Sequence, residues 1–226
     1  MGKRGPKPKR KDIVWTPELA YAVGLITTDG CLSNDGRHLT FVSKDMEQIQ
    51  NLKKCLKLTV KVGIHRSGRP DAKRTYHRLQ WGDVTLYNFL LGIGLMPNKS
   101  RQLASVAIPD LYFFDFLRGH YDGDGSFYSY FDPRWKSSFM FYLAFISGSR
   151  PHVLWLQENI KRFCGVVGHV VLTGKNGHKI SNVRYAKREA SIVLARMYEN
   201  KNAVSLSRKR LKIERALRIV GKSLPK

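Results

Sequence analysis

The chain has 226 residues, which is enough for one large domain or two small ones with a buried core. Lys and Arg number 40 against 17 Asp and Glu, and the resulting net charge of +23 makes a polyanion the expected partner. No apolar stretch approaches the roughly 20 residues of a membrane span, and the three cysteines are widely separated with no C-x-x-C spacing. These features argue against a membrane protein and a disulfide scaffold, and they favour an intracellular protein that works with nucleic acid.

The first half of the chain divides into a basic segment and a predicted folded unit. Residues 1–15 hold many Lys, Arg, Gly and Pro residues, so we expect a flexible basic arm. Residues 16–104 form the first unit, which opens with Thr16 as the expected N-cap of a helix. Its other predicted elements are a strand over 37–43, a helix over 45–57 with Met46, Ile49, Leu52 and Leu56 inside, a hairpin, and a helix from Asp83 to about Gly94.

Residues 105–226 are predicted to repeat this plan and to end in a basic C-terminal helix. The expected elements are a helix from Pro109-Asp110, an aromatic strand pair around Asp132-Pro133, a helix from Pro151 to Phe163, a hairpin turning at Gly174 to Gly177, and a helix over 187–198. The segment Phe41-Val-Ser43 matches Phe145-Ile-Ser147 at a shift of 104 residues. We therefore predict an α+β fold of two pseudo-symmetric αββαββα halves, each with a curved antiparallel sheet.

Two helix-length stretches share an unusual pattern. Residues 19–30 and 114–125 each carry an interior glycine, Gly24 or Gly119, and an Asp-Gly end that contains Asp29 or Asp124. An interior glycine costs a helix roughly 0.5–1 kcal/mol relative to alanine, and an acid at a helix C-terminus faces the negative end of the macrodipole. Two such local costs at matched spacing indicate a functional site, with the glycines at the contact between two helices.

The sequences Ala22-Val-Gly-Leu-Ile-Thr-Thr-Asp-Gly30 and Leu117-Arg-Gly-His-Tyr-Asp-Gly-Asp-Gly125 both resemble the motif of the LAGLIDADG homing endonucleases. The first copy departs from the motif at Thr27, where an acid is frequent. The resemblance implies a site-specific endonuclease that makes a metal-dependent double-strand break in a long, pseudo-palindromic DNA target. It also implies a monomer, with no membrane and no small-molecule substrate.

The resemblance further implies roles for individual residues. Asp29 and Asp124 would bind Mg²⁺ together with the backbone carbonyls of Thr28 and Gly123; Mn²⁺ would substitute, and Ca²⁺ would support binding without cleavage. Lys99 and Lys209 would act as catalytic cations, although Arg208 and Arg210 compete with Lys209 for the second position. Lys44 falls where the family places a polar residue near the water network, and its counterpart in the second half is Gly148.

Specificity is expected from the outward faces of the two sheets, where polar side chains alternate along the strands. The predicted DNA-binding residues are His38, Thr40, Lys44, Lys61, His65, Arg74, Tyr76, Arg78, Gln80, Lys136, Ser138, Met140, Tyr142, His178, Ile180, Asn182 and Arg184. Two alternatives stay open at this point: an intron maturase that binds RNA with the same fold, and a catalytically silent DNA-binding regulator.

The net charge of +23 generates the first prediction. Binding to duplex DNA should weaken steeply with salt, because each neutralised phosphate contributes about −0.9 to the slope of log K against log salt concentration. A salt series of affinity measurements checks this. A flat dependence would contradict DNA as the partner.

Overall fold

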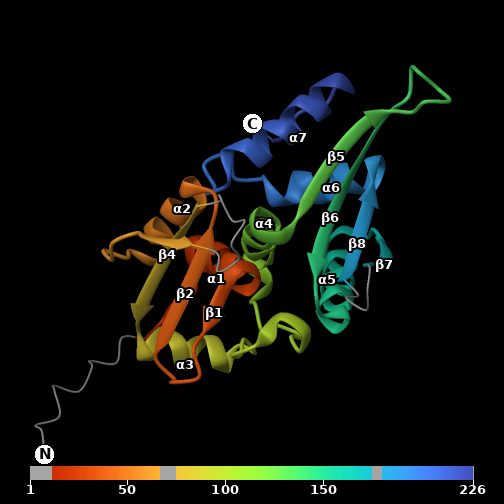
Figure 1. Cartoon of the computed structure of the whole chain (residues 1–226). Coiled ribbons are helices and arrows are strands. Elements are labelled where there is room, and N and C mark those ends of the chain that lie inside the picture. The colour runs from red at the N-terminus through yellow and green to blue at the C-terminus, as the bar shows by residue number, and fades with distance from the viewer. Residues whose placement is uncertain (1–11, 67–74, 175–179, 226) are drawn as a thin grey trace, which may run out of the picture.

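The computed structural model describes residues 12–66, 75–174 and 180–225. Two of the predicted DNA-binding residues, Arg74 and His178, lie outside the described residues. Within the described part, two sheets stand on either side of a central pair of helices (Figure 1).

Each α-helix of the first half begins where a capping residue predicts it. Thr16 accepts a hydrogen bond from Leu19 N and starts α1, Asp45 caps α2, and Asp83 caps α3. The elements are α1 Pro17–Asp29, β1 Gly30–Leu32, β2 His38–Ser43, α2 Met46–Leu56, β3 Gly63–Arg66, β4 Thr75–Gly82, α3 Val84–Gly92 and a short 3₁₀ turn, Lys99–Arg101.

The second half repeats the order with a longer first pair of strands. After a 3₁₀ turn at Asp110–Tyr112 come α4 Phe113–Asp124, β5 Ser126–Phe131, β6 Phe139–Ser147, α5 Arg150–Cys164, β7 His169–Thr173, β8 Ile180–Ala186 and α6 Lys187–Met197. A final helix, α7 Ser207–Ile219, begins next to the first turn of α2, where Ser207 binds Glu47, and runs from there toward the side of β5 (Figure 1). Among the described residues, no helix is long and apolar enough to span a membrane.

The two sheets share one topology and one register. Their strand orders are β1-β2-β4-β3 and β5-β6-β8-β7. Phe41 pairs with Leu79 in the first sheet, and Phe145 pairs with Val183 in the second, so both partners are displaced by the same 104 residues. The prediction of two pseudo-symmetric αββαββα halves is therefore confirmed.

Helices α1 and α4 pack backbone to backbone between the sheets (Figure 1). At Gly24, an added Cβ would lie 2.6 Å from the backbone nitrogen of His120 and would also overlap the carbonyl oxygen of Phe116. At Gly119, it would collide with the backbone of Tyr21. Both glycines thus permit an approach that no side chain allows, which is the gain that offsets their cost in helix propensity.

Three details of the sequence-based prediction are wrong. In α2, Met46 is 36% exposed, whereas Gln48 and Cys55 are buried. Strand β6 begins only at Phe139, so Lys136 and Ser138 belong to the connecting turn because the hairpin closes later than its alternating pattern suggests. Lys61 likewise precedes β3 and lies outside any strand.

The glycine contact generates a stability prediction. Gly24→Ala and Gly119→Ala should each lower the free energy of unfolding by about 3 kcal/mol, because a methyl group must push two backbones apart. Gly92→Ala is the matched control, since no heavy atom lies within 4 Å of its added Cβ, and it should be nearly neutral. Chemical denaturation measures all three, and unchanged stability of the first two variants would mean that the helices can separate without cost.

Candidate active site

Asp29 and Asp124 lie side by side because they end the two paired helices. Gly123 fits against the end of α1, where an added Cβ would overlap the Thr28 side chain and lie 3.0 Å from Asp29 Oδ2. The absence of a side chain at Gly123 thus lets the two helix ends meet. As a result, one acid from each half faces the same space.

The surroundings of both acids disfavour their charged forms. Burial, and then the negative charge of Asp124, raises the pKa of Asp29 to about 6, although a hydrogen bond from Gln48 and the charges of Lys209 and Lys99 act in the opposite direction. Asp124 is exposed on one side, yet partial desolvation raises its pKa as well, against the charges of Lys209 and Lys99. The nearby lysines therefore do not supply enough positive charge to keep the pKa values of the two carboxyl groups at their ordinary level. Shifted pKa values of this kind are typical of a functional site.

A buried lysine, Lys99, and a half-buried one, Lys209, flank the acids at equivalent places. Lys99 is 5% exposed and its Nζ donates to the carbonyl oxygen of Gly30, the residue after Asp29. Lys209 Nζ donates to Gly125, the residue after Asp124, at 2.8 Å. It also donates to the carbonyl oxygens of Tyr121 at 2.6 Å and Gly123 at 3.0 Å, and burial lowers its pKa to about 8.

The neighbours of Lys209 point elsewhere. Arg208 pairs with Asp45 at 2.7 Å, and Arg210 pairs with Glu214 at 2.9 Å. Of the three basic residues that competed for the second cation position, the geometry thus places Lys209 beside the acids. Its catalytic role, like that of Lys99, stays a prediction.

Two further polar residues of this region were missed by the sequence analysis. Gln48 is 4% exposed, and its amide nitrogen donates to Asp29 Oδ2 at 3.1 Å and to the carbonyl oxygen of Asp122 at 3.3 Å. Asp122 is 1% exposed, accepts from Tyr21 Oη and from Leu206 N, and burial raises its pKa to about 6. The position of Asp122 in the second motif, where an acid is frequent, was the available signal for it. No pattern singled out Gln48.

The donor atoms at the helix ends suit a hard divalent cation. Mg²⁺ is commonly held by one or two carboxylates, with water and substrate phosphates completing the shell. Asp29 and Asp124 supply such a pair, and the carbonyl oxygen of Gly123 faces the same region but already accepts from Lys209. Among residues 12–66, 75–174 and 180–225, no group of three or more His, Cys, Asp or Glu side chains forms a ready-made metal cage. The site thus fits a cation that is shared with a bound phosphate.

The first sheet presents the predicted polar row on its outer face. Thr40 lies opposite Gln80, His38 opposite Gly82, and His65 opposite Tyr76, while Leu39, Phe41, Leu79 and Trp81 point to the core. Arg78, Gln80 and Lys44 are exposed, and the Lys44 ammonium lies 5.3 Å from the centre of the Tyr76 ring. Their contact with DNA stays a prediction.

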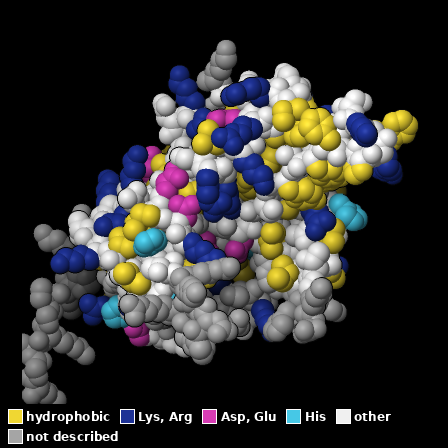
Figure 2. Space-filling model, turned by 45° about the horizontal axis from the view of Figure 1, so that its top comes forward, with side chains coloured by type: hydrophobic (Ala, Val, Ile, Leu, Met, Phe, Trp, Pro, Cys, Tyr) yellow, Lys and Arg dark blue, Asp and Glu magenta, His cyan; other side chains and the backbone are white. Residues whose placement is uncertain are grey.

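The outer face of the second sheet has a different character. Tyr128, Tyr142 and Tyr130 stack with ring centroids 5.1 and 6.3 Å apart, and Figure 2 shows a hydrophobic band along the protruding β5–β6 hairpin. Met140 and Arg184 are half-buried, and Ile180 is exposed. Asn182 was expected to be exposed but is 4% exposed, because its amide is held by Arg184 and Thr173. Neither Tyr128 nor Tyr130 was among the predicted DNA-binding residues.

The geometry can be compared with known proteins. No family model and no curated protein matches the sequence. Among solved structures, the homing endonuclease I-WcaI bound to its DNA recognition sequence is 16% identical, with a TM-score of 0.60 and 88% of each chain covered. The meganuclease I-SmaMI bound to uncleavable DNA is 12% identical, with a TM-score of 0.57 over 92% of this chain and 93% of the other.

A third similar structure is the N-terminal LAGLIDADG domain of DUF199/WhiA, which is 15% identical with a TM-score of 0.53 over 81% of this chain and 82% of the other. The fold of the present chain is thus that of a two-motif α+β protein with paired helix-end acids. It is the LAGLIDADG homing endonuclease fold.

The raised pKa of Asp29 generates a prediction about stability in the absence of metal. Because the folded-state pKa of about 6 exceeds the ordinary value of 3.8, the folded protein holds this proton more tightly than the unfolded chain. The resulting stabilisation is present at low pH and is lost as the pH rises through about 6.

Asp29→Asn should therefore be more stable than the wild type near pH 7 in EDTA, by roughly 1–3 kcal/mol, and the difference should shrink toward about pH 4. Asp110→Asn is the control, because Arg162 lowers the pKa of Asp110 and its removal should bring no gain. Thermal unfolding across pH measures both variants, and a stability difference that does not depend on pH would contradict the shifted pKa.

Proposed function

We propose that this protein is a metal-dependent DNA endonuclease that cuts both strands of a long, pseudo-palindromic target. The observation that supports the proposal best is the meeting of Asp29 and Asp124 at the paired helix ends, each followed by a glycine whose carbonyl oxygen accepts a hydrogen bond from a lysine. Both carboxylates are partly desolvated, and the charge of Asp124 disfavours the charged form of Asp29. A protein that only bound DNA would gain nothing from this arrangement.

The proposed reaction is the hydrolysis of one phosphodiester bond in each strand. A water oxygen forms a new bond to phosphorus, the bond from phosphorus to the leaving oxygen breaks, and a proton from the water ends on the leaving group. Bound Mg²⁺ would supply a more acidic water and charge stabilisation for the leaving oxygen. Asp29 would hold a cation against the scissile phosphate of one strand, and Asp124 would do the same for the other strand. The ammonium groups of Lys99 and Lys209 would offset negative charge that develops near the helix ends.

Double-stranded DNA is the proposed partner, in line with the DNA-bound neighbours of the same fold. The spacing of exposed Arg78, Gln80 and Lys44 along the first sheet suits contacts to base edges and phosphates in a major groove. Since one chain supplies both acids and both sheets, a monomer would be sufficient for cleavage.

The catalytic prediction concerns the two acids. Asp29→Asn and Asp124→Asn should each abolish double-strand cleavage and leave DNA affinity unchanged or higher, because each removes a metal-ligand charge and some repulsion toward phosphate. The substrate can be the DNA that flanks the gene, joined without the insertion, or a site selected by cleavage from a randomised plasmid library.

Cleavage is measured on a plasmid with Mg²⁺, and binding is measured by gel shift with Ca²⁺. Asp110→Asn, which removes an exposed acid paired with Arg162, is the control and should cut like the wild type. Full cutting by either active-site variant would remove that aspartate from the reaction, and lost binding by a folded variant would make it a recognition residue.

A further inference from the structure

We infer that the two halves of the active site are unequal: a hydrogen-bond relay through Ser43 and Gln48 fixes Asp29 in advance, no such relay fixes Asp124, and the two DNA strands are therefore cut at different rates. This inference rests on the proposed endonuclease function. It assigns to Gln48 the role of a positioning residue that acts through Asp29.

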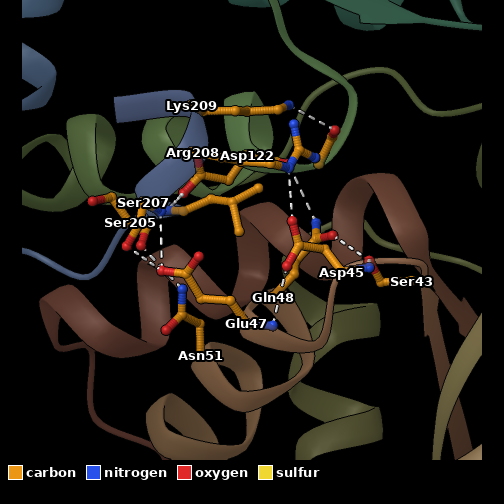
Figure 3. A network of polar contacts seen from close by, with 12 residues as sticks. Ser43, Asp45, Glu47, Gln48, Asn51, Asp122, Ser205, Ser207, Arg208 and Lys209 are labelled. Carbon is orange, nitrogen blue, oxygen red and sulfur yellow. Dashed lines mark hydrogen bonds and ion pairs between the residues drawn. The ribbon is translucent and has the colours of Figure 1, made fainter. Parts of the chain in front are cut away.

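The relay starts at the end of β2 and reaches the acid in three steps. The backbone N–H of Asp45 donates to Ser43 Oγ at 3.0 Å, and Ser43 Oγ donates to Gln48 Oε1 at 2.6 Å. Gln48 Nε2 then donates to Asp29 Oδ2 at 3.1 Å. Figure 3 shows Ser43, Asp45 and Gln48 gathered at the start of α2.

The relay also fixes which way the amide of Gln48 points. Ser43 Oγ already accepts the Asp45 N–H, so its own hydroxyl proton is directed to Gln48 Oε1. The second N–H of the amide lies toward the carbonyl oxygen of Asp122 at 3.3 Å. A flipped amide would place its oxygen against both Asp29 Oδ2 and this carbonyl, so the observed orientation is strongly preferred and one carboxylate oxygen of Asp29 is held in place.

The second half begins the same relay and does not finish it. Ser149 N donates to Ser147 Oγ at 3.1 Å, and these two residues lie 104 positions after Asp45 and Ser43. At the same shift, Gln48 corresponds to His152, which is 0% exposed and contacts the carbonyl oxygen of Ala104 through Nδ1 at 2.8 Å. His152 thus faces the core instead of the acid.

No other residue in the described ranges replaces the missing amide. Lys44 corresponds to Gly148, where an added Cβ would lie only 2.6 Å from the carbonyl oxygen of Ser100, so a side chain has no room there. Within the part of the chain that the structure describes, no side chain or backbone group donates a hydrogen bond to the Asp124 carboxylate. Asp124 is also the more exposed of the two acids.

A carboxylate that is already held in place and one that is free to rotate differ in the conformational entropy that they lose when the cation and phosphate bind. Asp29 needs no ordering when the cation and phosphate arrive, whereas Asp124 must lose side-chain freedom first. Hydrogen bonds to charged groups are strong enough for this difference to change a rate by about tenfold. The strand served by Asp29 is therefore cut first, and a nicked duplex accumulates before the double-strand break.

The test uses a duplex that carries a cleaved site, with a different dye on each strand, under single-turnover conditions with Mg²⁺. The wild type should cut one strand about tenfold faster than the other. Gln48→Met keeps the side-chain length but removes the amide, and it should slow the faster strand by about tenfold while leaving the other unchanged. Ser43→Ala should slow the same strand by a smaller factor, because Gln48 remains but its orientation is no longer fixed.

Ser147→Ala is the matched control. It removes the equivalent serine hydroxyl, whose one hydrogen bond among the described residues is with the Ser149 N–H, and should change neither strand. A non-catalytic readout comes from calorimetry with Ca²⁺ on the protein–DNA complex: Gln48→Met should weaken the tightest Ca²⁺-binding step, and Ser147→Ala should not. Thermal melting confirms that each variant is folded.

The possible outcomes separate the inference of unequal sites from the proposed endonuclease function. Equal strand rates in the wild type, an equal loss on both strands in Gln48→Met, or unchanged Ca²⁺ binding in that variant would overturn the unequal sites. Failure of the wild type to cut any selected DNA would instead overturn the proposed function, and the Ca²⁺ measurement would still test the relay.

Discussion

The side-chain-free contact between α1 and α4 is the constraint on which the rest of the structure depends. Gly24 and Gly119 bring the two helix backbones together, and this approach fixes the position of both helix ends. Asp29 and Asp124 meet only because the helices share this contact and because Gly123 leaves room beside Thr28. The same helices carry the sheets on either side, so the distance between the two sheets is set by the same packing (Figure 1).

The ends of α1 and α4 carry both positive and negative side chains. Free carbonyl oxygens at a helix C-terminus attract cations, and the ammonium groups of Lys99 and Lys209 occupy those places. The acids lie at the same negative ends, and burial raises the pKa of both, with the charge of Asp124 raising that of Asp29 further. The fold therefore tolerates an unfavourable pair of carboxylates that an additional cation would stabilise.

Much of this arrangement could be predicted from the sequence, because duplication makes the important features appear twice. The matched glycines and acids, and the register from Phe41 to Phe145, identified the fold and the central pair of helices. Gln48 could not be found in this way, since it has no glutamine counterpart and a polar residue in an amphipathic helix usually faces solvent. Asn182 and Lys136 were misplaced because alternation along a strand predicts neither the hairpin length nor which side chains cover a neighbour.

The contact between the paired helices also explains where the two halves differ. The paired helices cannot diverge freely, because a change on one backbone must suit the other. The elements outside this contact are under no such restriction, so the second half has a longer aromatic hairpin, with Tyr128, Tyr130 and Tyr142 stacked on its outer face. At the start of α5 it also has His152 in place of Gln48. A duplicated protein can thus keep one shared central geometry while the outer faces of its two sheets and the surroundings of its two acids become different.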